Sequence, residues 1–407
     1  MSKVRTTHAG SLPRTPALIE ANAARAEERI GQDELTQLLE TEVAGVVARQ
    51  AEAGLDLVND GEYGKLMTES VDYGAWWSYS FGRTGGLSID PDDQSWAVDS
   101  HLSSPGDVRL TGFLHRRDRA LFAGAYSDPT SGIWTGGDKP RPFPVVTGDL
   151  TYEGADAVRA DADHLVAALA AAGRGPETGF VTALSPGSAS RITDRHYGDE
   201  DAYLDAWARV LHEEYKAILD AGLWLQIDDP SVAENFDQIT PEPAVGDYVA
   251  FTEKRVAALN RALEGLPTER VRFHLCWGSW HGPHATDLPL ADIAPTMLTV
   301  NAAAYSFEAA NVRHEHEWRV WEDLTLPEDK VLVPGIVSHA TNVLEHPELV
   351  ADRVERFARL VGPERVWAST DCGLGGRVHE EIAWAKLDSL VAGTRIANER
   401  LARGSAA

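Results

Sequence analysis

Short apolar runs that suit β-strands alternate with amphipathic stretches that suit α-helices along nearly the whole sequence. The runs predicted as strands are 3–9, 55–60, 143–148, 179–184, 223–228, 271–276, 296–302, 331–336 and 365–370. The stretches predicted as helices are 32–53, 155–172, 200–221, 245–264, 346–361 and 379–402. Strands and helices in alternation indicate a parallel sheet, and about eight such units close into a barrel. The sequence therefore predicts an α/β protein with a (β/α)8 TIM barrel.

The alternation is interrupted once, over roughly 71–142. This stretch is rich in Gly, Ser and Asp, and it carries the aromatic residues Trp76, Trp77, Tyr79, Phe81 and Trp134. Loops of this length inside a compact domain are commonly lids or small subdomains, and a surface excursion that packs on itself is the alternative. We assign 143–148, the strand in excess of eight, to a side hairpin or an edge. The expected organisation is one domain over 1–407, with 71–142 inserted after the second strand.

The charge of the chain limits its partners. With 63 acidic and 37 basic residues, the net charge is −26. Such a surface repels nucleic acid and anionic membranes, so we expect neither as a partner. The sequence has no apolar run long enough to span a bilayer, and its first residues, MSKVRTTHAG, lack the apolar stretch of a signal peptide. We expect a cytoplasmic protein, and no pattern indicates its oligomeric state.

Both cysteines of the chain stand where predicted strands end. Cys276 follows His274 by two residues at the end of 271–276, and Cys372 follows the last predicted strand. Side chains two residues apart in a strand point the same way, and barrel enzymes build their sites at the carboxyl ends of strands. Sulfur and imidazole ligands favour zinc, whose tetrahedral site Glu308 would complete. Two buried, inert thiols are the alternative.

The charge of this ligand set indicates a particular chemistry. A Zn²⁺ ion with two thiolates, one carboxylate and a neutral imidazole carries a single net negative charge. Such an electron-rich site polarises carbonyls poorly, but it can bind a substrate thiol as thiolate and leave the sulfur nucleophilic. If the thiolate replaces Glu308, the net charge is unchanged. The pattern therefore favours activation of a thiol.

Several longer motifs carry a resemblance to a known family and are scattered over nearly the whole chain. They are TTHAGSLPR at 6–14, DGE at 60–62, LQIDDP at 225–230, HLCWG at 274–278, YSFEAAN at 305–311, VPGIVSH at 333–339 and DCGLGGR at 371–377. With these motifs the chain resembles the catalytic barrel of cobalamin-independent methionine synthase. It also resembles the shorter relatives of that enzyme, which include epoxyalkane:coenzyme M transferase.

The resemblance implies a role for individual residues. By their match to the zinc motifs of the family, the metal ligands are His274, Cys276 and Cys372, with Glu308 at a more loosely spaced position. The positions that hold the amino acid part of homocysteine in the family are matched here by Ser11, Glu62 and Asp228. His339 matches the histidine proposed to protonate the leaving group, and we place it with Asp228 among the catalytic residues.

Other polar residues near these motifs are weaker candidates. Arg14 and Arg377 are possible contacts for an anionic group of the substrate, and His281 and His284 lie on a loop after the HLCWG motif. The run 314–316, His-Glu-His, has the composition of a ligand set, but its spacing suits one helix face poorly. Capping and surface roles are the preferred interpretation of that run.

Three hypotheses follow for the function. The first is zinc-dependent transfer of an alkyl group, with homocysteine accepting a methyl group as the leading case. The second keeps the zinc and opens an epoxide with a sulfonate-bearing thiol, or runs the reverse lyase step. The third is a non-catalytic thiol- or metal-binding barrel. The second, N-terminal barrel of full-length methionine synthase and its pterin platform have no match in this sequence, and 71–142 has no counterpart there, so the alkyl donor stays open.

Overall fold

The structure, a computed structural model, describes residues 3–67, 75–89, 101–112, 115–133 and 144–404, with the backbone alone for 76–78. Eight parallel strands form one sheet in the order β1-β10-β9-β8-β7-β6-β5-β2. Their bounds are Arg5–Thr6 (β1), Val58–Asn59 (β2), Gly179–Leu184 (β5), Trp224–Asp228 (β6), Val271–His274 (β7), Ala304–Phe307 (β8), Val331–Val337 (β9) and Trp367–Thr370 (β10).

The two outer strands of this sheet lie next to each other. The backbone N–H groups of Asp56 and Leu57, directly before β2, both donate to the carbonyl oxygen of Thr6 in β1 at 3.0 Å. These bonds bring the curled sheet round on itself. The predicted (β/α)8 barrel is therefore confirmed, and the carboxyl ends of its strands gather at one end, where such barrels carry their sites.

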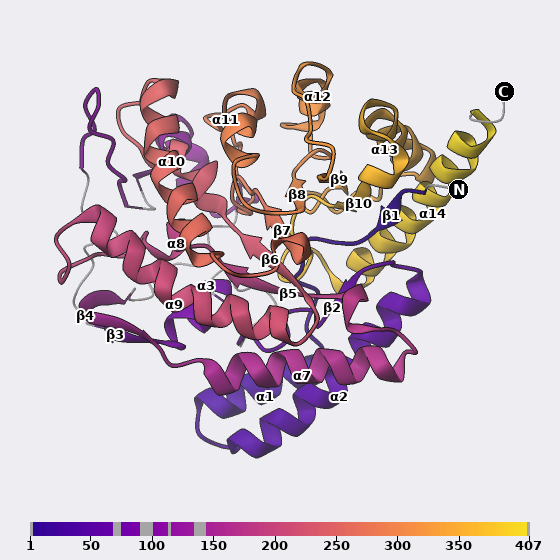
Figure 1. Cartoon of the computed structure of the whole chain (residues 1–407), viewed down its shortest axis with the longest axis horizontal. Helices are drawn as coiled ribbons and strands as arrows, with labels where there is room; N and C mark the ends of the chain where they lie inside the picture. The colour runs from indigo at the N-terminus through magenta and orange to yellow at the C-terminus, as the bar shows by residue number, and fades with distance from the viewer. Residues whose placement is uncertain (1–2, 68–74, 90–100, 113–114, 134–143, 405–407) are drawn as a thin grey trace.

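Helices surround the strands (Figure 1). The longer ones are α1 (Pro16–Ala26), α2 (Gln32–Ala53), α7 (Ala155–Ala171), α9 (Glu200–Asp220), α10 (Val245–Ala262), α11 (Leu290–Met297), α13 (Pro347–Val361) and α14 (Glu380–Gly404). Their ends follow local chemistry: the Asp199 side chain caps α9 by accepting from Ala202 N. Gly54 ends α2 at a φ of 94°, a left-handed conformation that glycine adopts without strain. The six predicted helices are all present, whereas α1 and α11 were not predicted.

The strand predicted over 296–302 is wrong. Those residues hold the end of α11 and a turn, in which Val300 N donates to Met297 O at 3.1 Å, and the strand is β8 instead. Met297 and Val300 are buried by packing of the helix end. A short buried apolar run has the same composition in a helix and in a strand, so periodicity did not separate the two.

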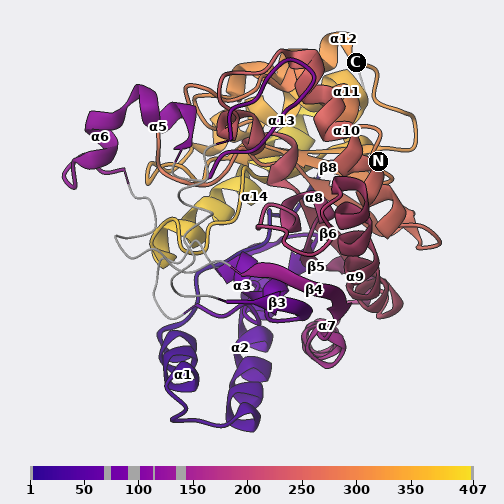
Figure 2. The same ribbon diagram turned by 90° about the vertical axis from the view of Figure 1, so that its left-hand side faces the viewer.

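The surplus strand forms a side hairpin, as predicted. β4 (Val145–Tyr152) pairs antiparallel with β3 (Thr84–Ser88) in a separate two-stranded sheet. Figure 2 shows this hairpin beside α3 (Ala75–Phe81), well apart from the short helices α5 (Arg117–Leu121) and α6 (Ala123–Ser127). That 71–142 is one inserted loop or subdomain stays a prediction, because Trp134 and the segments 68–74, 90–100, 113–114 and 134–143 lie outside the described residues, as do the Trp76 and Trp77 side chains.

The described part of the insertion contacts the loop that follows β6. Ser103 N donates to Thr240 O and Thr111 N donates to Gln238 O, both at 2.8 Å. Arg116 forms an ion pair with Glu234, which itself accepts from Arg191. The insertion is thus fastened to a loop at the carboxyl end of the barrel. In the part of the chain that the structure describes, no helix is both long and apolar enough to cross a lipid bilayer.

Candidate metal centre and substrate site

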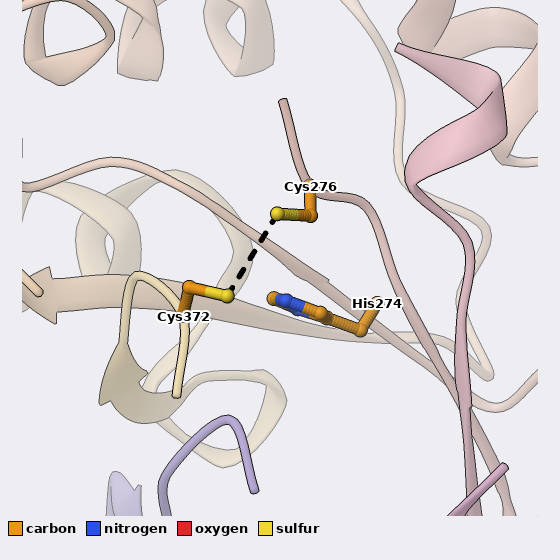
Figure 3. A group of neighbouring side chains, drawn as sticks. All are labelled: His274, Cys276 and Cys372. Atoms are coloured by element: carbon orange, nitrogen blue, oxygen red, sulfur yellow. Dashed lines mark hydrogen bonds between the residues drawn. The ribbon is translucent and has the colours of Figure 1, made fainter. Parts of the chain in front are cut away.

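Three predicted ligands converge at the carboxyl ends of β7 and β10. His274 is the last residue of β7, and Cys276 and Cys372 follow β7 and β10 by two residues each. The two sulfur atoms are 3.7 Å apart. One ligand atom from each of the three residues lies within 4.8 Å of the others, and Figure 3 shows the imidazole and both thiols pointing toward one common region.

The imidazole of His274 is fixed at one nitrogen and unpartnered at the other. Nδ1 shares a hydrogen bond with the Ser306 hydroxyl of β8 at 3.0 Å. Nε2 is buried and has no hydrogen-bond partner among the described residues. A buried polar atom without a partner is destabilising unless something binds it. Two thiols facing such a nitrogen fit a metal ion that prefers sulfur and nitrogen ligands.

The two thiols differ in their surroundings. A hydrogen bond from Cys276, together with the nearby His274, outweighs desolvation and lowers the pKa of the Cys372 thiol, whereas the same sulfur pair and burial raise the pKa of Cys276. The backbone N–H of Gly278 donates to the Cys276 sulfur at 3.2 Å, and the Ser279 hydroxyl lies 3.3 Å from the Cys372 sulfur. These contacts favour negative charge on sulfur, the form that binds metals.

Glu308 lies beside this group, directly after β8. Its Oε1 accepts from Trp277 N at 3.1 Å and its Oε2 accepts from the Asn311 side chain at 2.7 Å. Burial raises the pKa of its carboxyl to about 8. A ligand atom of Glu308 lies within 4.8 Å of ligand atoms of His339 and Asp371. These three residues form a cluster separate from that of His274, Cys276 and Cys372. Its role as fourth ligand stays a prediction.

His339 follows β9 and is buried at the same end of the barrel. Its Nδ1 has no hydrogen-bond partner within the described ranges. Burial is the main cause that lowers the pKa of its imidazole to about 4. The ring is therefore neutral at pH 7 and retains one N–H. We refer to the five residues around this point as the metal side: His274, Cys276, Glu308, His339 and Cys372.

The opposite part of the barrel mouth carries Glu62 and Asp228, which are predicted to bind the amino acid part of a substrate thiol. Glu62 follows β2 at a φ of 61°, a strained left-handed conformation for a non-glycine residue. Its Oε1 accepts from the Thr182 hydroxyl at 3.0 Å, and its Oε2 lies 3.4 Å from Lys65 Nζ. Asp228 ends β6, accepts from Gln226 at 2.7 Å, and has its pKa raised to about 7 by burial.

Asp228 connects the two sides. In the sheet it is the register partner of Leu184 in β5 and of His274 in β7. Charges on His274, Glu62 and Lys65 all act on its carboxyl. The structure therefore brings the acidic substrate residues and the metal side into one site. We refer to the following residues as the head-group side: Ser11, Glu62, Lys65, Thr182 and Asp228.

Ser11 ties the two sides together through backbone contacts. Its carbonyl oxygen accepts from the N–H groups of Leu374 and Gly375 at 2.9 Å each. A Cβ added to Gly373 would lie 2.9 Å from the Cβ of Ser11, so the turn after Cys372 needs glycine to approach this closely. The Ser11 hydroxyl accordingly sits next to the segment that carries one of the candidate ligands.

The comparisons with known proteins decide the family. The model described as the catalytic domain of cobalamin-independent synthase matches residues 4–73 and 119–395. The chain belongs to this family. The matched stretches leave out 74–118, which falls inside the predicted insertion. The family is enzymatic and methionine synthase-like, as the resemblance of the motifs indicates.

Individual relatives align with most of this chain. A methionine synthase from Sulfolobus acidocaldarius is 23% identical over 401 residues, covering 97% of this chain and 93% of the relative. A 2-hydroxypropyl-CoM lyase from Xanthobacter autotrophicus is 24% identical over 402 residues, covering 92% and 89%. The structure of a B12-independent methionine synthase from a Shewanella species, in complex with selenomethionine, superposes with a TM-score of 0.67 at 19% identity, covering 99% and 100%. This last likeness supports the barrel fold.

The two predicted anion contacts are placed differently within this family barrel. The Arg14 guanidinium donates to Ser11 Oγ at 2.6 Å, Leu12 O at 3.1 Å and Glu62 O at 2.5 Å. These hydrogen bonds brace the loops that carry Ser11 and Glu62. Arg377 is half-buried, and its charge helps to lower the pKa of the His339 imidazole. Of the two, only Arg377 acts on the metal side.

His284 and His314 form hydrogen bonds to acidic side chains in the loops beside the candidate ligands. Both ring nitrogens of His314 are engaged, with Glu317 at 2.8 Å and Asp287 at 3.1 Å, and its ring stacks on Trp277. These acids outweigh burial and raise its pKa to about 10. His284 also contacts Asp287, at 3.0 Å. The run 314–316 therefore supports the loop beside Cys276, and His314 is buried rather than at the surface.

Asp371 is a buried residue beside the candidate site that the sequence analysis did not single out. Its Oδ1 accepts from the N–H groups of Ala309 and Ala310, and its Oδ2 accepts from that of Asn311, all at 2.8 Å. It therefore holds the turn that presents Glu308. A signal was available, because Asp371 directly precedes a candidate ligand in the DCG motif.

Proposed function

We propose that this protein is a zinc-dependent enzyme that transfers an alkyl group to a thiol, with methyl transfer to homocysteine as the leading case. The observation that carries the proposal is the pair of thiols 3.7 Å apart, facing the unpartnered Nε2 of His274. Two sulfur ligands and one imidazole fit zinc, with Glu308 as a displaceable fourth ligand. When bound, zinc would hold the substrate thiol as a thiolate at neutral pH.

The chain's own residues orient the two reactants. The carboxylates of Glu62 and Asp228, with the Ser11 hydroxyl, are placed to hold the ammonium group of an amino acid thiol, since Asp228 lies one strand from His274. This directs the substrate sulfur to the metal side. The neutral imidazole of His339 keeps one N–H, which can donate a hydrogen bond to the leaving group, and the ring can pass on a proton only after it has taken one up from water. Glu308, held by Trp277 and Asn311, can return to its present hydrogen bonds when displaced.

A second candidate keeps the same metal chemistry with another pair of substrates. The relative named 2-hydroxypropyl-CoM lyase is as similar to this chain, at 24% identity, as the methionine synthase at 23%. Two cations, Lys65 on the head-group side and Arg377 near His339, also suit a sulfonate-bearing thiol. This reading gives opening of an epoxide by such a thiol, or the reverse lyase step. A non-catalytic thiol-binding barrel is the third alternative.

The experiment that tests the proposal combines a metal assay with a substrate matrix. Protein purified without added metal should contain about one zinc per chain. It should then be assayed with homocysteine and 2-mercaptoethanesulfonate, each against a methyl donor and a short epoxide, with the chelator-treated protein as control. Thiol-dependent, zinc-dependent turnover of any pair supports alkyl transfer, and the active pair identifies the reaction. Absence of zinc, or turnover that survives its removal, would contradict the proposal.

A further inference from the structure

Lys65 is a buried cation to which the proposed methyl transfer assigns no role. It lies three residues after Glu62, with 7% of its surface exposed. Its Nζ donates to the Thr182 hydroxyl at 2.5 Å, lies 3.4 Å from Glu62 Oε2, and sits 4.4 Å from the centre of the Tyr79 ring. All of these partners belong to the barrel mouth or to the helix that follows β2.

A second buried lysine shows what a fully paired ammonium looks like in this protein. Lys386 Nζ donates to Glu345 Oε2 at 2.9 Å and to Val343 O at 2.8 Å. The contact of Lys65 with Glu62 is 0.5 Å longer than the Lys386 ion pair, 3.4 against 2.9 Å. Charge-assisted hydrogen bonds are ordinarily about 2.7–2.9 Å long. Among the residues that the structure describes, the Lys65 ammonium has one close hydrogen bond for its three N–H donors.

Burying such an ammonium is unfavourable unless anions compensate for the lost water. The aromatic face of Tyr79 stabilises the cation in part. Glu62 can compensate fully only if it moves closer, and its carboxylate is also held by Thr182. An anion entering the site would supply the missing partner for Lys65.

The position of Glu62 depends on the glycine at position 10. A Cβ on Gly10 would lie 2.4 Å from Glu62 Oε1, so the absence of a side chain at Gly10 lets the carboxylate approach the loop that carries Ser11. Glu62, Lys65 and Ser11 thereby converge. Arg14, the other cation of this region, donates to carbonyl oxygens and to Ser11. Lys65 is the cation better placed for an added anion.

We infer that Lys65 binds the anionic head group of the thiol acceptor, so that the enzyme selects thiols that carry an acidic group. The inference rests on the proposed function and narrows its substrate class. A carboxylate of an amino acid thiol and the sulfonate of an alkanesulfonate thiol share this chemistry. For the amino acid thiol, Glu62 and Asp228 pair with the ammonium while Lys65 pairs with the carboxylate.

The test compares three thiols with the zinc-loaded protein: homocysteine, 2-mercaptoethanesulfonate and the neutral 2-mercaptoethanol. Dissociation constants are measured by calorimetry for the unmodified protein, Lys65→Met and Lys65→Arg. Lys216→Met, an exposed lysine paired with Asp220, is the matched control. Lys65→Met should weaken the acidic thiols about 10- to 100-fold, the scale of one lost hydrogen bond to a charged group, and change 2-mercaptoethanol less than about 2-fold. Lys65→Arg should restore part of the loss.

Glu62→Gln separates the two sources of the anion. If the acceptor is an amino acid thiol, this variant weakens the binding of homocysteine, because its ammonium loses a counter-charge, and does not weaken the binding of 2-mercaptoethanesulfonate, which has no ammonium. The inference would be overturned if Lys65→Met weakened the binding of all three thiols equally or did not weaken it at all. Lys65 would then be a structural counter-ion of Glu62. Turnover by the unmodified protein would still support the proposed function. Thermal unfolding and zinc content of each variant show that the fold is retained. Failure of the zinc-loaded protein to bind any thiol would instead overturn the proposed function and this assignment together.

Discussion

The metal side and the head-group side of the site differ in the chemical groups that they bring together. On the metal side, two sulfur atoms 3.7 Å apart face an imidazole nitrogen that has no partner in the described structure. On the head-group side, the Glu62 carboxylate and the Lys65 ammonium both contact the hydroxyl of Thr182. The first arrangement gathers soft donor atoms, whereas the second sets one ammonium, that of Lys65, against the carboxyl groups of Glu62 and Asp228.

This difference indicates which substrate group each side accepts. Soft donors without a cation favour a metal and, through it, the substrate sulfur. A site of paired opposite charges favours a substrate end that is itself charged, because each of its groups finds a counter-charge. Asp228, at the end of β6 and in register with His274, lies at the boundary. Under the proposed function, the two sides of the site would accept opposite ends of one small molecule.

The largest expected effect is on the metal side alone. Cys276→Ser or Cys372→Ser should abolish zinc binding, because each removes a sulfur ligand from a site with only three close donors. Elemental analysis of the purified variants measures the loss. Ser279→Ala, which removes a hydroxyl near Cys372 but no predicted ligand, is the matched control. If both cysteine variants retained their full zinc content, Cys276 and Cys372 would not be metal ligands, and the proposed difference between the metal side and the head-group side would be wrong.

A smaller effect is expected for turnover. His339→Gln should keep zinc and thiol affinity while the rate falls by a factor on the order of 10² to 10⁴, the usual scale for losing a proton donor. Steady-state kinetics with a zinc assay on the same samples measures both. The decrease should be smaller for an alkyl donor whose leaving group needs no proton. Loss of zinc would make His339 a ligand in place of Glu308, and an unchanged rate would assign the proton to water.

The smallest effect concerns the fourth ligand. Glu308→Gln should bind zinc about 10- to 100-fold more weakly, since the amide can still accept from Trp277 but carries no charge for the metal. Competition with a chelating dye gives the affinity. Asp371→Asn should also weaken zinc binding, because Asp371 fixes the turn that presents Glu308. If Glu308→Gln binds zinc unchanged, the carboxylate is not a ligand.

The metal side was largely predictable from the sequence, and the head-group side was predictable only in part. His274, Cys276 and Cys372 stand in short motifs at strand ends, so parallel-sheet geometry alone brings them together. Ser11, Glu62 and Asp228 came from the resemblance of their motifs. Lys65 carries no such signal, because its burial depends on Thr182 and Tyr79, which are distant in sequence or belong to another element.

The errors have similar physical causes. The strand predicted over 296–302 failed because a buried helix end and a buried strand have the same apolar composition. Asp371 was not singled out because its three backbone partners lie about sixty residues earlier in the chain, at 309–311. The prediction of Arg14 as an anion contact stays a prediction, and its guanidinium donates to the Ser11 hydroxyl and to carbonyl oxygens of the loops that carry Ser11 and Glu62. Local sequence pattern predicts the candidate ligands, whereas long-range packing determines which groups the remaining charged side chains contact.

The central claim is that a substrate thiol joins the metal through its sulfur, and zinc X-ray absorption tests it most directly. The zinc-loaded protein should show two sulfur neighbours at about 2.3 Å, from Cys276 and Cys372. After addition of the thiol that binds most tightly, the account predicts three sulfur neighbours at the same distance. A sulfur count that stays at two when the thiol is bound, as judged by calorimetry on the same sample, would contradict the claim.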